Sequence, residues 1–161
     1  MEPPDFYLET SVWGSLARGQ PQDRKQVVLR LLRLLDGVKG RCVISDVVRA
    51  EIKEAPSDEA ALILRHVERY MPVVYPISAE IESLASAYIT SGALPIGRQA
   101  DALHVAAATC LRLDYLDSWN HRHMTRPMKR LKYESVNRLH GYLKTPLICN
   151  PFEACDEIRN R

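Results

Sequence analysis

The chain has 161 residues, of which 46% are hydrophobic and 26% are charged, and its formal net charge is +2. A length of this order suits one hydrophobic core, so we expect a single domain over residues 1–161. The small net charge excludes a uniformly basic protein that coats a polyanion. A nucleic acid would therefore have to bind to a local patch of the surface.

The sequence carries no pattern of export or membrane insertion. Its start, "MEPPDFYLET", is acidic and contains proline, whereas a signal peptide begins with a basic segment followed by an apolar one. No apolar run approaches the roughly 20 residues that a membrane-spanning helix needs. We expect a cytoplasmic protein that does not contact a membrane.

Short apolar runs alternate with amphipathic stretches along the chain. From Gln22 to Asp36 the apolar residues recur at the spacing of one helix face, and Ser57 and Ser78 are placed to cap further helices. We expect strands at residues 6–10, 41–45, 72–78 and 114–119, helices at 11–18, 22–36, 46–55, 57–71, 79–91, 97–113 and 127–139, and a last extended piece at 145–154. Strands separated by helices predict an α/β fold with a central, mainly parallel sheet.

Several polar residues are predicted to lie at strand ends or at nearby helix starts. Glu9 ends the first strand, Glu51 lies in the helix after the second, and Asp101 heads an otherwise apolar helix. The segment "LDSWN", residues 116–120, ends another strand. Because the carboxyl ends of parallel strands meet at one edge of a sheet, these side chains can converge there.

Each acid taken alone also has a plainer interpretation. The helix dipole favours an acid such as Asp101 in a first turn, and Glu51 can be a solvated helix residue like its neighbour Glu54. His104, one turn after Asp101, is either a core histidine or a residue that orients a carboxylate. The sequence leaves these alternatives open.

A cluster of carboxylates has two ways to relieve its repulsion. At an effective dielectric near 20, two unit charges about 5 Å apart repel by roughly 3 kcal/mol. The groups then either retain protons or bind a hard cation. Oxygen ligands without converging histidine or cysteine favour Mg²⁺ or Mn²⁺ over zinc.

Four segments together carry a resemblance to a known family. The segments "YLETSVWGSL", "VISDVVRAEI", "GALPIGRQADALHVAAATCLRLDYLDSWNHRH" and "GYLKTPLICNPFE" resemble PIN-domain proteins of the VapC-like toxin group, from type II toxin–antitoxin pairs. The resemblance covers nearly the whole chain, with its sharpest match at residues 92–123 and its weakest at 20–40. It implies a three-layer α/β/α domain whose strand ends hold acids around Mg²⁺ or Mn²⁺ and which cleaves RNA.

Position by position, the resemblance assigns the acids of the site. Glu9 matches the first acid, Glu51 the second and Asp101 the third, and these three would hold the metal. The fourth acidic position falls on Asn120, with Ser118 at the hydroxyl position two residues before it. Asn120 would act as a ligand or position a water molecule, and Ser118 would lend a hydroxyl hydrogen bond.

Two of these residues depart from the family pattern. Glu9 stands where the family usually has aspartate, and its side chain is one methylene longer. Asn120 lacks the charge of an acid, which weakens any second metal and puts a strict two-metal mechanism in doubt. Asp117 could serve as a ligand instead only if the strand register turns it toward the site.

A basic segment follows the strand-end residues and offers a site for an RNA backbone. Residues 121–133 contain no acid, and we expect substrate binding by four of their cations, Arg122, Arg126, Lys129 and Arg130. Thr10, at the start of a helix, offers a hydroxyl to a phosphate. The plainer alternatives are a solvated basic helix face and an ordinary helix cap.

These residues and the resemblance together predict a Mg²⁺- or Mn²⁺-dependent endoribonuclease, and the resemblance implies products with a 5′-phosphate and a 3′-hydroxyl. The resemblance also implies a small antitoxin partner and a homodimer, for which the apolar helix face between residues 27 and 35 is a possible interface. Because of Asn120, the main alternative is a catalytically weak or inactive PIN-like module that binds RNA or protein. A second alternative is a nuclease that acts on DNA or flap structures.

Overall fold

A computed structural model describes residues 3–36 and 41–160 of the protein. Its centre is a five-stranded sheet in the order β3-β2-β1-β4-β5, and every neighbouring pair of strands is parallel. The strands are short and run over Phe6–Leu8 (β1), Cys42–Ser45 (β2), Val73–Tyr75 (β3), Tyr115–Asp117 (β4) and Leu147–Cys149 (β5). The order places the first strand in the middle of the sheet.

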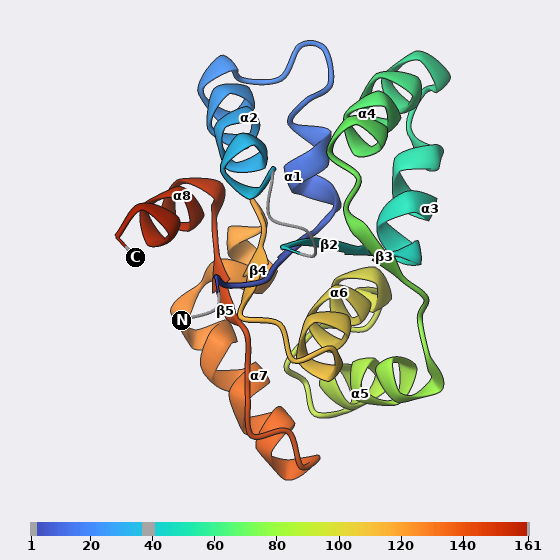
Figure 1. Ribbon diagram of the computed structural model, residues 1–161. Helices are drawn as coiled ribbons and strands as arrows, with labels where there is room; N and C mark the ends of the chain where they lie inside the picture. The colour runs from blue at the N-terminus through green and yellow to red at the C-terminus, as the bar shows by residue number, and fades with distance from the viewer. Residues whose placement is uncertain (1–2, 37–40, 161) are drawn as a thin grey trace.

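Helices cover both faces of this sheet. In Figure 1, α1, α2 and α8 lie above the sheet, and α5, α6 and α7 lie below it. The helices are Thr10–Gly14 (α1), Gln22–Leu35 (α2), Asp46–Glu54 (α3), Ser57–Tyr70 (α4), Ala79–Thr90 (α5), Gln99–Cys110 (α6), Pro127–Leu139 (α7) and Pro151–Arg159 (α8), with a π-helical turn at His121–Thr125 (η1). The predicted three-layer α/β/α architecture with a parallel sheet is confirmed.

The apolar helix face of residues 27–35 is part of the core. Its members Val27, Val28, Leu31, Leu32 and Leu35 are all buried within the single chain, and α2 packs against α8. The possibility that this face forms a dimer interface is therefore wrong. A helix stripe shows that a face is buried, but it does not show what covers it.

Most of the predicted elements are present, and the departures have local causes. Residues 150–154 were expected to be extended, yet Asn150 and Glu153 form a reciprocal capping box that starts α8 at Pro151. The π-helical turn η1 has no counterpart among the predicted elements. Helix α6 is shorter than expected and ends at Cys110, shortly before Arg112, whose φ is 55°. Ser57 is the first residue of α4 rather than its cap, which is Pro56.

The chain contains four cysteines, and the structure shows each of them as a free thiol. Within the described residues, none of the helices combines the length and the hydrophobicity needed to cross a bilayer.

Candidate active site

The residues proposed from the sequence lie where the strands of the sheet end. Glu9 directly follows β1, and its backbone N–H donates to the carbonyl of Asp117 at the end of β4, at 3.2 Å. Glu51 lies in α3, which begins directly after β2, and Asp101 lies in the first turn of α6. The parallel sheet thus brings the ends of β1, β2 and β4 together, as its topology requires.

Glu9 is a buried carboxylate held by two serine hydroxyls. Its side chain is about 5% exposed, and Ser11 Oγ donates to its Oε1. Ser118 gives it a second hydrogen bond. Both serines also bind the loop after β4, since Ser11 Oγ accepts from the Trp119 backbone and Ser118 Oγ from the Asn120 backbone, each at 2.9 Å. Burial raises the pKa of Glu9, although His104 and the serines oppose the rise.

Glu51 is held differently from Glu9. Its Oε1 accepts from Thr10 Oγ1 at 2.7 Å and from His104 Nε2 at 2.6 Å. Burial alone would raise the pKa of Glu51, but the hydrogen bond and charge of His104, with the bond from Thr10, outweigh burial and lower it. Glu51 is therefore the acid of this group that favours its ionised form.

Asp101 contacts Asn120, the residue at the fourth position of the site. Asn120 Nδ2 donates to Asp101 Oδ2 at 3.3 Å, while its Oδ1 accepts from the backbone N–H of His123 at 3.0 Å. Burial raises the pKa of Asp101, His104 and Arg98 oppose this, and Glu51 adds to it. The amide of Asn120 is uncharged, so it hydrogen-bonds to Asp101 without neutralising the negative charge of that residue.

The side chains at this edge of the sheet carry the kind of ligand atom that a hard cation prefers. Glu9, Glu51, Asp101 and Asn120 all offer oxygen atoms, the ligands that Mg²⁺ and Mn²⁺ prefer. Burial is the main cause of the raised pKa values of Glu9 and Asp101, so the ionised form of each carboxylate has lost solvation that a bound cation would replace. Among the described residues no three acidic, histidine or cysteine side chains are yet arranged to hold a metal ion, so binding requires side-chain adjustment.

Asp117 does not belong with these donors. Side chains alternate along a strand, and Asp117 raises the pKa of Cys42, Cys149 and Cys155, which marks the α2–α8 side of the sheet. Its carboxylate is fully buried, and no side chain in the described part of the chain donates a hydrogen bond to it. Burial, with Glu9 next, raises the pKa of Asp117 well above its usual range. The register pairs Asp117 with Leu8 and so places its side chain on the face of the sheet opposite to that of Tyr7, and the condition for its use as a ligand is not met.

The predicted substrate-binding residues fall into two groups. Arg122 and Arg126 are exposed. Lys129 Nζ donates to the carbonyl of Ala93 at 2.7 Å, and Arg130 Nε donates to that of Thr125 at 2.8 Å. Arg130 also lies 3.6 Å from a carboxylate oxygen of Glu153. Two of the four cations are thus engaged in structural contacts.

Thr10 does not present a free hydroxyl, because it donates to Glu51. The sequence placed Ser11 beside Glu9 at a helix start but did not predict its hydrogen bond to that acid; it did not find Tyr7, and it left the role of His104 open. The position of Ser11, two residues after Glu9, would have suggested a contact between them. Tyr7 could also have been found, because alternation along β1 places it on the same face as Glu9.

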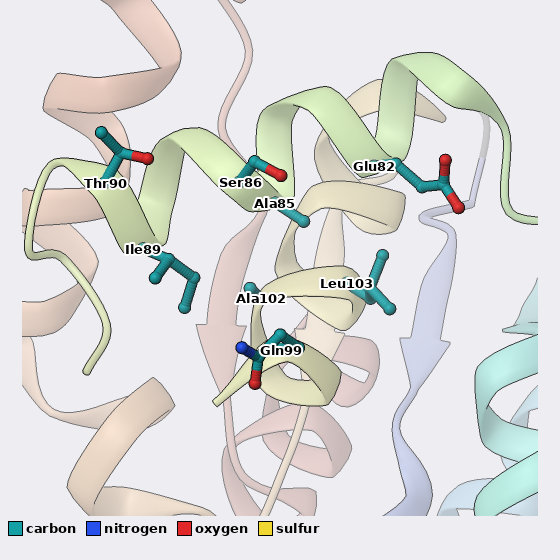
Figure 2. Close-up of a pocket in the computed structure, with 8 residues that line it drawn as sticks. All are labelled: Glu82, Ala85, Ser86, Ile89, Thr90, Gln99, Ala102 and Leu103. Carbon is teal, nitrogen blue, oxygen red and sulfur yellow. The ribbon is translucent and has the colours of Figure 1, made fainter. Parts of the chain in front are cut away.

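A separate hollow of about 480 Å³ lies between α5 and α6. Figure 2 shows its lining residues, which are Glu82, Ala85, Ser86, Ile89, Thr90, Gln99, Ala102 and Leu103. Gln99 and Ala102 flank Asp101 in the sequence, yet none of the three acids of the site lines this hollow. It is therefore distinct from the carboxylate edge.

Comparison with known proteins gives a match only at the level of structure. Neither protein-family models nor curated protein sequences match the chain. The structure is similar to Mycobacterium tuberculosis VapC20, a sarcin-ricin loop cleaving toxin, with a TM-score of 0.59 at 14% identity over 88% of this chain and 98% of that one. It is also similar to Rickettsia felis VapBC2 bound to a promoter DNA fragment, with a TM-score of 0.55 at 15% identity over 90% and 97%.

A third similar structure is FitAB bound to a DNA fragment, with a TM-score of 0.55 at 15% identity over 91% of this chain and 95% of that one. All three are PIN-domain toxin–antitoxin proteins, the group that the sequence resembles. The chain therefore has the fold of the PIN-domain toxins.

Proposed function

We propose that the protein is a metal-dependent endoribonuclease and the toxin of a toxin–antitoxin pair. The observation that carries this proposal is the placement of Glu9, Glu51 and Asp101 around one buried residue, His104, which acts on the pKa of all three. Carboxylates that lie near one another and are partly removed from water are suited to a divalent cation. The similarity to a toxin described as cleaving the sarcin-ricin loop supports RNA as the substrate.

In this proposal Glu9, Glu51 and Asp101 hold Mg²⁺ or Mn²⁺, and Asn120 assists them through its amide. The bound cation would supply Lewis-acid activation and neutralise charge on the phosphate. Ser11 and Ser118 hold the carboxylate of Glu9 in place.

The substrate is held by cations beside the carboxylates. Arg122 and Arg126 bind the RNA backbone, with Lys129 and Arg130 as weaker contributors because their side chains also bond to the protein. A water molecule attacks the phosphorus in line with the P–O3′ bond. That bond breaks and its oxygen takes up a proton, which leaves a 5′-phosphate and a 3′-hydroxyl.

The proposal includes a small antitoxin protein, a homodimer and a cytoplasmic location. The antitoxin is supported by the similarity to VapBC2 and FitAB, which were each solved bound to DNA. The homodimer follows from the sequence resemblance, and its interface lies elsewhere than on the buried face of α2. Sedimentation of the purified chain measures the oligomeric state directly.

Asn120 favours a second candidate, a PIN-like module that binds RNA or protein without cutting it. An amide at this position removes one negative charge from the site and hydrogen-bonds to Asp101. Such a binder would retain its RNA affinity in Glu51→Ala and would show no turnover that depends on a metal.

The deciding experiment is RNA cleavage with Mg²⁺ by the wild type, Asp101→Asn and Asp58→Asn. Asp58 is a matched control because it is an exposed acid in the first turn of another helix, α4. We expect cleavage by the wild type and by Asp58→Asn and a loss of at least about a hundredfold in Asp101→Asn, the lower end of what general acid–base and charge-stabilising groups contribute. Undiminished cleavage by Asp101→Asn would exclude this assignment, and preference for single-stranded DNA in competition would exclude RNA as the substrate.

A further inference from the structure

We propose that His104 and Tyr7 are positioning residues that hold the carboxylate of Glu51 in one orientation for cation binding. The inference rests on the proposed function, because it takes Glu51 to be a metal ligand. It assigns a role to two buried polar residues that are neither acids of the site nor contacts of the substrate.

A chain of hydrogen bonds links the sheet to Glu51. Ser45 Oγ lies 2.7 Å from the hydroxyl of Tyr7, and that hydroxyl lies 2.8 Å from Nδ1 of His104. His104 Nε2 lies 2.6 Å from Oε1 of Glu51. These groups come from β2, β1, α6 and α3 in turn. The orientation of a side chain on α3 is thereby tied to three other elements.

Burial makes this chain of bonds rigid. Ser45 and Tyr7 are fully buried, and His104 is about 1% exposed, whereas the side chain of Glu51 is 32% exposed. The aromatic rings of Tyr7 and His104 also contact each other, with centroids 5.7 Å apart. A buried polar group that loses its partner destabilises the fold, so each bond resists breaking. Glu51 thus carries an accessible carboxylate on a buried, fixed support.

The direction of the hydrogen bonds follows from the atoms available. The carboxylate of Glu51 can only accept, so His104 Nε2 carries a proton and donates. The hydroxyl of Tyr7 can both donate and accept. When the imidazole is neutral, Nδ1 accepts from Tyr7 and Ser45 donates to Tyr7; when the imidazole is protonated, Nδ1 donates to Tyr7 and Tyr7 donates to Ser45. Every group in the chain then has a partner.

The position of these bonds on the carboxylate matters for a cation. Both His104 and Thr10 bond to Oε1 of Glu51. Among the described residues no donor reaches the other oxygen, Oε2, which remains available. Two donors on one oxygen fix the plane and the rotation of the carboxylate. Side chains that orient a ligand in this way usually change metal affinity about 10- to 100-fold when they are replaced.

The test compares Mn²⁺ affinity, measured by calorimetric titration, in variants that remove different parts of the chain. His104→Gln keeps an N–H near the position of Nε2 and so can still donate to Glu51. His104→Asn places its amide near Nδ1, which keeps a partner for Tyr7 and loses the bond to Glu51. We expect near wild-type affinity in His104→Gln and a dissociation constant about 100-fold higher in His104→Asn.

A second pair of variants keeps the test decisive if the histidine variants fold poorly. Tyr7→Phe removes only the hydroxyl that fixes His104, and Tyr88→Phe is its matched control. Tyr88 is another buried tyrosine whose hydroxyl bonds to Asn137, on the α5–α7 side of the molecule. We expect Mn²⁺ binding about tenfold weaker in Tyr7→Phe and unchanged in Tyr88→Phe, with both midpoints of thermal unfolding recorded.

The possible outcomes separate this inference from the proposed function. If the wild type binds Mn²⁺ and His104→Asn and Tyr7→Phe bind it equally well, the positioning role is wrong and the metal site stands. The same conclusion follows if His104→Gln and His104→Asn lose affinity to the same extent. If the wild type itself binds no Mn²⁺, the proposed function is overturned together with the inference.

Discussion

Asn120 donates a hydrogen bond from its amide to the carboxylate of Asp101 at 3.3 Å. This contact replaces the repulsion that two acids would have at the same place. The amide therefore stabilises the metal-free protein, and the site holds one fewer negative charge for a cation.

Asn120→Asp should strengthen cation binding and weaken the metal-free fold. The new carboxylate loses the donated hydrogen bond and repels Asp101, whose pKa burial already raises. We expect a dissociation constant for Mn²⁺ about tenfold lower, because added ligand charge increases affinity for hard cations. Calorimetric titration measures this, and a midpoint of thermal unfolding that falls without metal and recovers with Mn²⁺ accompanies it. Unchanged affinity would show that this position does not face the cation.

Glu9→Gln should make the free energy of unfolding less dependent on pH. Burial raises the pKa of Glu9 in the folded protein, so the stability it contributes is present below the usual carboxyl range and is lost as the pH rises through the raised value. We expect the wild type to lose more stability than Glu9→Gln between pH 5 and pH 8. Urea unfolding at the two pH values measures the difference, and an identical loss in both proteins contradicts it.

Mn²⁺ should reverse that loss in the wild type. A ligand at 100 times its dissociation constant adds about 2.7 kcal/mol to the free energy of unfolding when it binds only the folded state. We expect a gain of this order at pH 8 for the wild type and little gain for Glu9→Gln. Thermal unfolding with and without Mn²⁺ measures it, with Asp58→Asn as the control that should gain as much as the wild type.

Asp117→Asn should keep the stabilisation by Mn²⁺ that Glu9→Gln loses. The carboxylate of Asp117 is fully buried, and its pKa is raised well above the usual range by burial and then by Glu9 and Glu153. We expect higher stability at pH 8 than in the wild type, because the variant has no acid to ionise there. Stabilisation by Mn²⁺ should be retained, and its loss would place Asp117 at the site after all.

Arg122 and Arg126 should contribute more to RNA binding than Lys129 and Arg130. The first two are exposed, whereas Lys129 bonds to the carbonyl of Ala93 and Arg130 to that of Thr125. The double variant Arg122→Ala/Arg126→Ala should weaken RNA binding and lower the slope of log affinity against log salt by about 1–2, since each phosphate contact contributes about 0.7–0.9 to that slope. An equal effect of Lys129→Ala/Arg130→Ala would contradict the distinction.

The sequence pattern predicts the layers and the edge of the sheet where the acids meet. Alternating strands and helices require parallel pairing, and parallel pairing brings Glu9 and Glu51 to one edge. The face of the sheet on which a strand residue lies depends on where the strand begins. The sequence does not fix that point, so it could not predict whether Asp117 faces the other acids. The Ser11 hydroxyl also accepts from the backbone of Trp119, 108 residues away in sequence, and no local pattern reveals this second contact.

Other features were readable in principle but had competing interpretations. Asn150, Pro151 and Glu153 carry the signals of a helix start, yet the apolar run before them favoured an extended piece. His104 sits among small apolar residues, a setting that suits a core histidine as well as a carboxylate partner. The structure combines the two, because this buried ring bonds to Tyr7 on one side and to Glu51 on the other.

The most direct test of the central claim is RNA cleavage by the wild-type protein with Mn²⁺ and with EDTA, followed by analysis of the product ends. The account predicts cleavage only with the cation, and fragments that carry a 5′-phosphate and a 3′-hydroxyl. Equal cleavage in EDTA, or fragments with a 2′,3′-cyclic phosphate, would contradict a metal-dependent hydrolysis at Glu9, Glu51 and Asp101.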